Sequence, residues 1–265
     1  MRPLSHSSIS MYLECPQKYK FKYIDKIPEK PKYFFSFGQS VHSALEFFYG
    51  VPALPAPSLE EVLENYQKNW KKEGYKDAHQ EREYFEEGKK ILVRFYEKHI
   101  QDFKPPFFAE YSFTFEVDGV PVTGKVDRID KLENNKIAIV DYKTGKAFDL
   151  SRVKEDSQLT MYQMATEELL GFKVDHLTFY HLPSLTPLTV FPHSLEQVNS
   201  LRKRIVQVAE SIQAEKFDPK PEERKCNWCD FKPLCPIFKH LYASSTAEPG
   251  SDFQKLPTPS LFPDF

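Results

Sequence analysis

Two neighbouring stretches of the chain carry the pattern that decides its fold. Residues 124–130 read GKVDRID, and residues 139–145 read IVDYKTG. Both are typical of β-strands, whose side chains alternate between the two faces of a sheet. Asp141 and Lys143 therefore project from one face of the second strand, and Tyr142 projects from the other. A carboxylate and an ammonium group lie side by side.

The turn between these strands decides whether a second carboxylate joins them. A three-residue turn at Glu133–Asn135 puts Asp127 directly opposite Asp141. A two-residue turn at Asn134–Asn135 sets Asp127 opposite Tyr142, because a slip of one residue moves every side chain to the other face. We therefore predict a turn of odd length, or a bulge that restores the phase.

Paired carboxylates on adjacent strands suggest a particular chemistry. They form a hard oxygen site for Mg²⁺ or Mn²⁺. Such an ion lowers the pKa of water and neutralises the charge that develops on a phosphodiester, and Lys143 is placed to hold the attacking water or the scissile phosphate. The alternative is an exposed hairpin with solvated charges, but the apolar run at 137–140 is typical of a buried strand. The pattern favours a metal-dependent nuclease.

Four other segments contain residues that bind metals or polar ligands. They are SISMYLECP at 8–16, FGQSVHSALE at 37–46, QLTMYQ at 158–163 and CNWCDFKPLCP at 226–236. With the two strands, and in this order, they resemble the PD-(D/E)XK nucleases, specifically the RecB-like branch, over most of residues 5–240. The arrangement is most similar to that of the CRISPR-associated RecB-like exonucleases and the AddB nuclease domain.

The resemblance implies a set of metal ligands and a catalytic group. It gives His42, Asp127, Asp141 and the carbonyl of Tyr142 as ligands of Mg²⁺ or Mn²⁺, with Lys143 orienting the attacking water. Without the resemblance, a lone histidine on the apolar face of a helix is more typical of a half-buried structural residue.

A glutamine and a tyrosine further along the chain complete the expected active site. Gln158 and Tyr162 lie four residues apart and so on one helix face. The resemblance implies that both point into the active site, where they contact the DNA backbone or hold Lys143. From the residues alone, a capping glutamine and a packed tyrosine are an equal alternative. Glu110 is a weaker candidate, and we expect it to be a solvated carboxylate at a strand end.

The four cysteines of the chain are Cys15, Cys226, Cys229 and Cys235. Their number and spacing allow structural zinc, two disulfides or a [4Fe-4S] cluster. The first residues lead into a polar stretch without the apolar core of a secretory signal, so disulfides are disfavoured. The resemblance favours a [4Fe-4S] cluster over zinc, in a structural role that ties the first helix to the last segment.

Composition limits the classes of partner. The 265 residues carry a formal net charge of −2, which gives no overall attraction to nucleic acid and argues against a simple binding protein. Lysines and aromatic residues interleave over 18–33, either to grip a single strand or as the two faces of an amphipathic helix. No apolar run approaches the ~20 residues that span a bilayer, so we expect a cytoplasmic protein without a membrane partner.

Apolar periodicity outlines the architecture. It predicts helices over 7–23, 37–49, 59–73, 80–100, 155–170 and 195–215, and strands over 108–117, 120–132, 136–143, 174–182 and 187–192. This order predicts an α/β fold with a mixed central β-sheet flanked by helices, a restriction-endonuclease-like core. We assign 1–104 to an amino-terminal helical cap, 105–216 to the nuclease core, 217–243 to a cysteine segment and 244–265 to a disordered tail. Hydrophobic residues at the end of the tail could dock to a partner.

Together these expectations describe a metal-dependent DNA exonuclease acting on single strands or ends, in repair, recombination or CRISPR spacer processing. The sequence contains no Walker loop or helicase motif, so a helicase or a CRISPR adaptation protein would be a separate partner. One alternative is a non-catalytic or partner-activated DNA-binding or assembly module stabilised by a metal cluster. Another is a zinc-stabilised binding protein.

Overall fold

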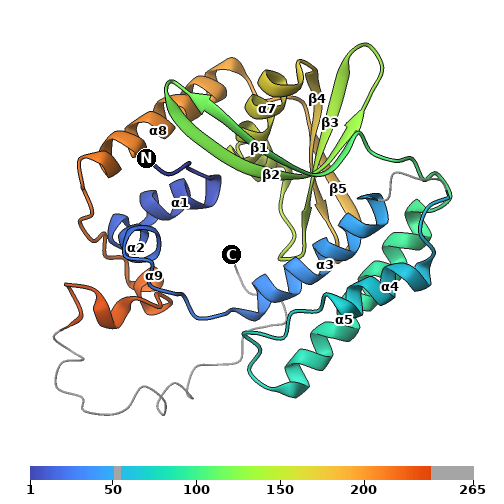
Figure 1. Ribbon diagram of the computed structural model, residues 1–265, viewed down its shortest axis with the longest axis horizontal. Coiled ribbons are helices and arrows are strands. Elements are labelled where there is room, and N and C mark those ends of the chain that lie inside the picture. The colour runs from blue at the N-terminus through green and yellow to red at the C-terminus, as the bar shows by residue number, and fades with distance from the viewer. Residues whose placement is uncertain (51–54, 240–265) are drawn as a thin grey trace.

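The computed structural model describes residues 1–50 and 55–239, arranged as Figure 1 shows. Its first part is helical and contains α1 (His6–Glu14), α2 (Pro16–Tyr19), a π-helical turn (Lys20–Ile24), α3 (Tyr33–Gly50), α4 (Leu59–Lys68) and α5 (Ala78–His99). The tail predicted at 244–265 lies outside the described residues.

The remainder of the chain contains the sheet. Its elements are β1 (Phe108–Val117), β2 (Val120–Lys131), β3 (Lys136–Lys143), α6 (Leu150–Lys154), α7 (Ser157–Leu170), β4 (Lys173–His181), β5 (Thr186–Val190), α8 (Leu195–Gln213), α9 (Glu223–Asn227) and a 3-10 turn (Lys232–Leu234). Strands pair in the order β1-β2-β3-β4-β5. Among the strands of the described residues, β3 and β4 form the one parallel pair, and α6 and α7 connect them. The predicted mixed sheet flanked by helices is confirmed.

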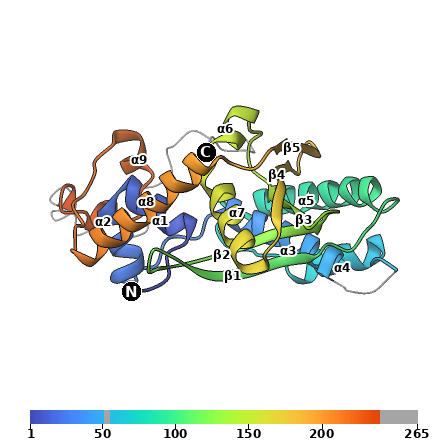
Figure 2. The ribbon, with the colours of Figure 1, turned by 90° about the horizontal axis from the view of Figure 1, so that it is seen from above.

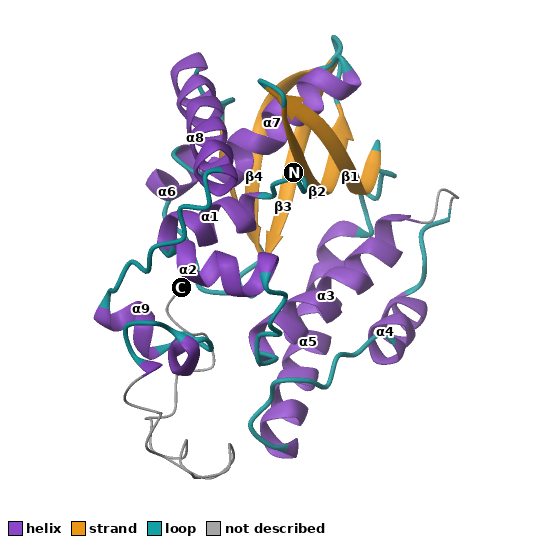
Figure 3. Cartoon of the chain, turned by 60° about the vertical axis from the view of Figure 1, so that its left-hand side comes forward, coloured by secondary structure: helices purple, strands orange, loops and turns teal. Residues whose placement is uncertain are grey.

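The two faces of the sheet carry separate hydrophobic cores. Figure 3 shows α3, α4 and α5 on one side and α7, α8 and α1 on the other, and Figure 2 gives the view from above. Tyr142 and Tyr180 pack with α3 and α5, whereas Ile139 and Leu177 pack with α7 and α8. Alternation along β3 and β4 therefore sends neighbouring residues into different cores.

Several of the helices begin at residues whose side chains satisfy free amide groups of the first turn. Ser58 and Ser194 each form a capping box with the residue three positions later, the arrangement that saturates two donors at once. Asp156 caps α7 by accepting from the amides of Gln158 and Leu159. This cap fixes the first turn of α7, which carries Gln158.

The first predicted helix is divided into three parts. Cys15 is extended, with φ −158° and ψ 108°, between α1 and α2, and Pro16 begins the second helix, where its missing amide donor is tolerated. Within this segment Tyr19 is fully buried, while Lys18 and Lys20 pair with Glu14 and Asp25. These contacts favour the amphipathic interpretation of the basic and aromatic residues over a single-strand grip. The short helix α6 was not predicted.

Within the described residues, the helices that the structure contains are too short or too polar to cross a membrane.

Three helices meet at Gly88 of α5. A Cβ atom there would lie 2.0 Å from the Tyr66 hydroxyl oxygen of α4 and 3.2 Å from the Phe37 ring of α3. We expect Gly88→Ala to lower the free energy of unfolding by about 1–3 kcal/mol, because overpacking outweighs the ~1 kcal/mol that alanine gains in a helix. Urea unfolding measures the change. The control is Gly50→Ala, where a Cβ would meet nothing within 4 Å, and equal stability of the two variants would contradict the clash.

Candidate active site

The turn between β2 and β3 has the predicted odd length. The Leu132 amide donates to the Lys136 carbonyl at 2.8 Å, which closes a three-residue turn. Asn134 and Asn135 take left-handed conformations, with φ of 56° and 58°, and asparagine tolerates this region better than most residues. The register that aligns Arg128 with Val140 sets Asp127 opposite Asp141 when it is extended by one residue, so the predicted odd-length turn is confirmed.

The expectation of a solvated Glu110 is wrong. The β1–β2 register aligns Ala109 with Arg128 and Tyr111 with Val126, and therefore sets Glu110 beside Asp127. Glu110 has φ 54°, a conformation that needs support from its surroundings. Its side chain is 11% exposed and pairs with Lys125 at 2.5 Å.

Burial raises the pKa of Glu110, and the nearby Asp127 carboxylate adds to this rise. Glu110, Asp127 and Asp141 thus form a row of carboxylates across three adjacent strands. The sequence contained a usable signal for Glu110, because a two-residue turn at Asp118–Gly119 fixes the β1–β2 register.

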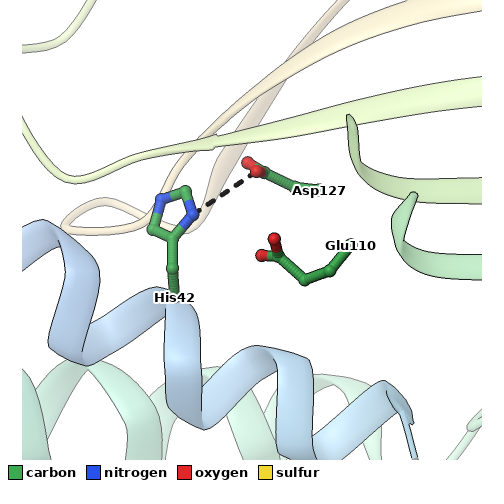
Figure 4. A group of neighbouring side chains, drawn as sticks. All are labelled: His42, Glu110 and Asp127. Atoms are coloured by element: carbon green, nitrogen blue, oxygen red, sulfur yellow. Dashed lines mark ion pairs between the residues drawn. The ribbon is translucent and has the colours of Figure 1, made fainter. Parts of the chain in front are cut away.

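His42 reaches this row from α3, as Figure 4 shows. Its Nδ1 atom lies 3.4 Å from Asp127 Oδ1, and its Nε2 atom lies 3.0 Å from the Tyr142 carbonyl oxygen. Burial alone would lower the pKa of the imidazole, but the Asp127 carboxylate reverses this and raises the pKa of His42 to about 9. The carboxylate therefore favours the protonated, positively charged form of the His42 imidazole.

Asp127 interrupts the β2–β3 ladder with its side chain. Pairing ends at Arg128 and Val140, and the Tyr142 amide donates to Asp127 Oδ2 at 2.7 Å instead. Burial alone would raise the pKa of Asp127, but the neighbouring His42 holds it below its ordinary value. The carboxylate is thereby held in its ionised form.

Asp141 and Lys143 lie together, as their spacing requires. Asp141 is 3% exposed, and burial raises its pKa to about 6. Lys143 Nζ approaches Asp141 Oδ2 to 2.7 Å, yet this buried oxygen receives no properly aligned hydrogen bond. A buried carboxylate oxygen in that condition is available to a further ligand.

Helix α7 delivers the remaining predicted residues to the same place. Lys143 Nζ donates to Gln158 Oε1 at 2.8 Å, and Gln158 Nε2 donates to the Tyr162 hydroxyl at 2.8 Å. The Lys143 ammonium also lies 4.6 Å from the centre of the Phe179 ring. The lysine is thus held from several sides, and Gln158 contacts it directly.

The donor atoms of this site fit a divalent cation. Among the described residues, His42, Glu110 and Asp127 form the one group of three or more potential ligands whose atoms all lie within 4.8 Å of one another. Carboxylate oxygen atoms suit Mg²⁺ and Mn²⁺, and imidazole nitrogen is a borderline ligand for these ions. The buried Asp141 oxygen described above extends the same set.

The four cysteines lie together at a second place, away from the carboxylates. All are free thiols, and all line one small half-open cavity. The amides of Lys220 and Glu222 point at Cys15 Sγ and Cys226 Sγ, at 3.5 and 3.4 Å. No three of the four sulfur atoms lie within 4.8 Å of one another, whereas zinc–sulfur bonds of about 2.3 Å would hold them about 3.8 Å apart.

This cavity joins the two ends of the described chain. Figure 1 shows α2 beside α9. The rings of Phe21 and Phe231 lie 5.5 Å apart, and Lys32 pairs with Asp230 at 3.3 Å. Residues before α3 therefore pack against residues after α8.

Comparison with known proteins agrees with this geometry. The chain is 25% identical to the Gene 69 proteins of Mycobacterium phages D29 and L5, over 89% of its length and 97% and 96% of theirs. A solved structure described as a "Putative exonuclease" from Eubacterium rectale has a TM-score of 0.53 at 15% identity, covering 94% of this chain and 91% of that one. The family model of the PD-(D/E)XK nuclease superfamily matches residues 3–236. The chain therefore belongs to the PD-(D/E)XK nuclease superfamily.

Proposed function

We propose that the protein is a metal-dependent DNA exonuclease of the RecB-like kind that acts on single strands or ends. The observation that carries this proposal is the row of Glu110, Asp127 and Asp141, which His42 approaches from one side and Lys143 from the other. The exonuclease mode draws support from the similar structure from Eubacterium rectale and from the RecB-like motifs.

The proposed metal ligands are His42, Asp127, Asp141 and the Tyr142 carbonyl, with Glu110 added from the structure. A bound Mg²⁺ or Mn²⁺ would supply Lewis-acid stabilisation of charge on the phosphate and lower the pKa of water. The protein itself contributes charged side chains that are positioned and shielded from water before the substrate binds.

Lys143 has the central part in the proposed mechanism. Its ammonium group orients the attacking water or a non-bridging oxygen of the scissile phosphate as a compact positive charge. Gln158 holds that group at 2.8 Å and is itself held by Tyr162. In-line attack by water on the phosphorus breaks the bond to the 3′ oxygen, so the fragment on the 3′ side of the cut carries a 5′-phosphate and the other fragment ends in a 3′-hydroxyl.

We also propose that the cysteine cavity holds a [4Fe-4S] cluster rather than zinc. Four free thiols line one cavity, and four thiolates are the ligand set of a [4Fe-4S] cluster. Amides that point at two of these sulfur atoms are the kind of contact that tunes iron–sulfur clusters. Visible absorption with iron and sulfide analysis of anaerobically purified protein tests this assignment, and stoichiometric zinc without iron would contradict it.

The nuclease proposal is tested by digestion of labelled DNA. Wild type and Asp141→Ala are incubated with end-labelled linear single strands, linear duplexes and circular single strands, with Mn²⁺ and with chelator. We expect metal-dependent release of label from linear single strands by wild type only, and no attack on circles. A folded, cluster-loaded wild type that is inactive on every substrate would instead favour a non-catalytic or partner-activated assembly module.

Glu110 is expected to act through metal affinity. In Glu110→Gln we expect the Mn²⁺ concentration for half-maximal activity to rise about 10- to 100-fold, the effect typical of groups that support a metal site, while the rate at saturating metal changes less. A titration of activity with Mn²⁺ measures both. Glu116→Gln, an exposed change on the same strand, is the control, and identical metal curves for the two variants would count against a role for Glu110.

A further inference from the structure

One face of helix α3 is directed toward the candidate active site. Phe35, Gln39, His42 and Glu46 recur at spacings of three and four residues, so they share one face of the helix. Phe35, Gln39 and Glu46 are exposed, and His42 contacts the Tyr142 carbonyl. The neighbouring residues that face inward, such as Val41, are buried.

The direction of this face is fixed by contacts at the end of β3. His42 meets Tyr142, and one turn earlier a Cβ atom at Gly38 would lie 3.3 Å from Thr144 Oγ1. Thr144 follows Lys143 directly. The amino-terminal half of α3 therefore lies beside the residues that directly follow Lys143. Phe35 lies one helical turn before Gly38.

Phe35 presents an aromatic ring at the start of this face. It is 61% exposed, and its ring centre lies 4.6 Å from that of Phe34. Phe191 and Trp228 are even more exposed, so exposure by itself does not indicate a binding residue. The distinction is that Phe35 stands on the same face as His42, seven residues and about 10 Å earlier along the helix axis.

We infer that Phe35 is a stacking platform for an unpaired base of the substrate strand. The inference rests on the proposed nuclease function and names its substrate class. A strand that lies along α3, with stacked bases about every 3.4 Å, would bring to the ring a base about three nucleotides from the position of His42. Base–aromatic stacking is tolerant of sequence, since every base has a flat face.

This placement selects single strands and frayed ends. Inside a duplex, both faces of a base are covered by its neighbours, and its edge is paired. A ring fixed on α3 can cover a base only where that base is unpaired or terminal. Phe35 would thus contribute to binding of a single strand and contribute little to binding of an intact duplex.

The test combines variants of the protein with single-position changes of the DNA. Full-length, cluster-loaded wild type, Phe35→Ala and Phe35→Tyr are assayed with Mn²⁺ on single strands that carry one abasic site at successive positions. We expect Phe35→Ala to lower kcat/KM about 10-fold on intact single strands, the effect of losing one stack, while Phe35→Tyr stays near wild type. An abasic site at the contacted position should slow wild type similarly and should not slow Phe35→Ala further.

Two controls make the result specific. Phe191→Ala removes an exposed ring that is not on α3 and should change nothing, and thermal unfolding shows that each variant is folded. If Phe35→Ala cleaves like wild type, or if the abasic penalty is the same in both, the stacking role is wrong.

A binding measurement separates this inference from the nuclease proposal. In the Lys143→Ala background, single strands containing 2-aminopurine at one position are titrated with protein, with and without the additional Phe35→Ala change. Quenching at one position that requires Phe35 supports stacking even if wild type proves inactive. If wild type cleaves DNA but no position shows such quenching, the nuclease function stands and the stacking role of Phe35 is wrong.

Discussion

Lys143→Met lowers the rate of single-strand hydrolysis about 10²- to 10⁴-fold at saturating Mn²⁺, the range that one positioned polar catalytic group contributes. Methionine retains an apolar stem that can cover the Phe179 ring and removes only the ammonium group. Contacts to Asp141 Oδ2 at 2.7 Å and to Gln158 Oε1 at 2.8 Å are lost with it. Single-turnover kinetics measure the rate of the chemical step directly.

The matched control is Lys136→Met at the opposite end of the same strand. Lys136 pairs with Asp175 at the surface, and surface ion pairs of this kind contribute ~0–1 kcal/mol. Its loss should leave the rate and the fold unchanged. Binding of single strands, measured by fluorescence anisotropy, should be similar in both variants. A Lys143→Met enzyme that turns over at the wild-type rate would remove the lysine from the mechanism.

The second large effect is expected on stability, from Cys15→Ser. If the cysteine cavity holds a cluster, the cluster cross-links Cys15 to residues 226–235 across more than two hundred residues of chain. The loop-closure relation for such a cross-link gives about 5 kcal/mol of stabilisation. Loss of one thiolate ligand should therefore remove visible absorption and iron, and should lower the unfolding temperature by roughly 10–20 °C.

Two comparisons identify the source of that change. Wild type stripped of iron should unfold at the same temperature as Cys15→Ser, because both lack the same cross-link. Ser10→Ala, an exposed change on α1 five residues before Cys15, should leave the unfolding temperature and the absorption spectrum unchanged. If Cys15→Ser and loaded wild type unfold together, the cavity contributes no cross-link, and the packing of Phe21 on Phe231 suffices to join the two ends.

The strand residues of the site could be predicted because short turns convert sequence spacing into register. Three residues between two strands put Asp127 opposite Asp141 with no further information. The same arithmetic across Asp118–Gly119 places Glu110 beside Asp127, although a carboxylate at a strand end by itself suggests a solvated side chain. The left-handed backbone of Glu110 has no sequence signal, since it depends on the contacts around it.

Long-range contacts were accessible only through the family motifs. His42 meets Tyr142 across one hundred residues, and its helical pattern alone is that of an ordinary amphipathic helix. The break at Cys15, by contrast, could be predicted from Pro16, because proline disfavours helical conformation in the preceding residue. Partners of the lysines at 18–32 include Asp230, which lies too far away in sequence for local spacing to suggest.

The separation of the two cores by the sheet has a genetic consequence. His42 is positioned by the α3–α5 core, whereas Gln158 and Tyr162 are positioned by the α7–α8 core. Temperature-sensitive alleles should therefore fall into two classes. Substitutions that loosen the first core would be rescued by excess manganese, because the imidazole has drifted from the carboxylates. Substitutions in the second core would be insensitive to added metal, because the lysine has lost its orientation.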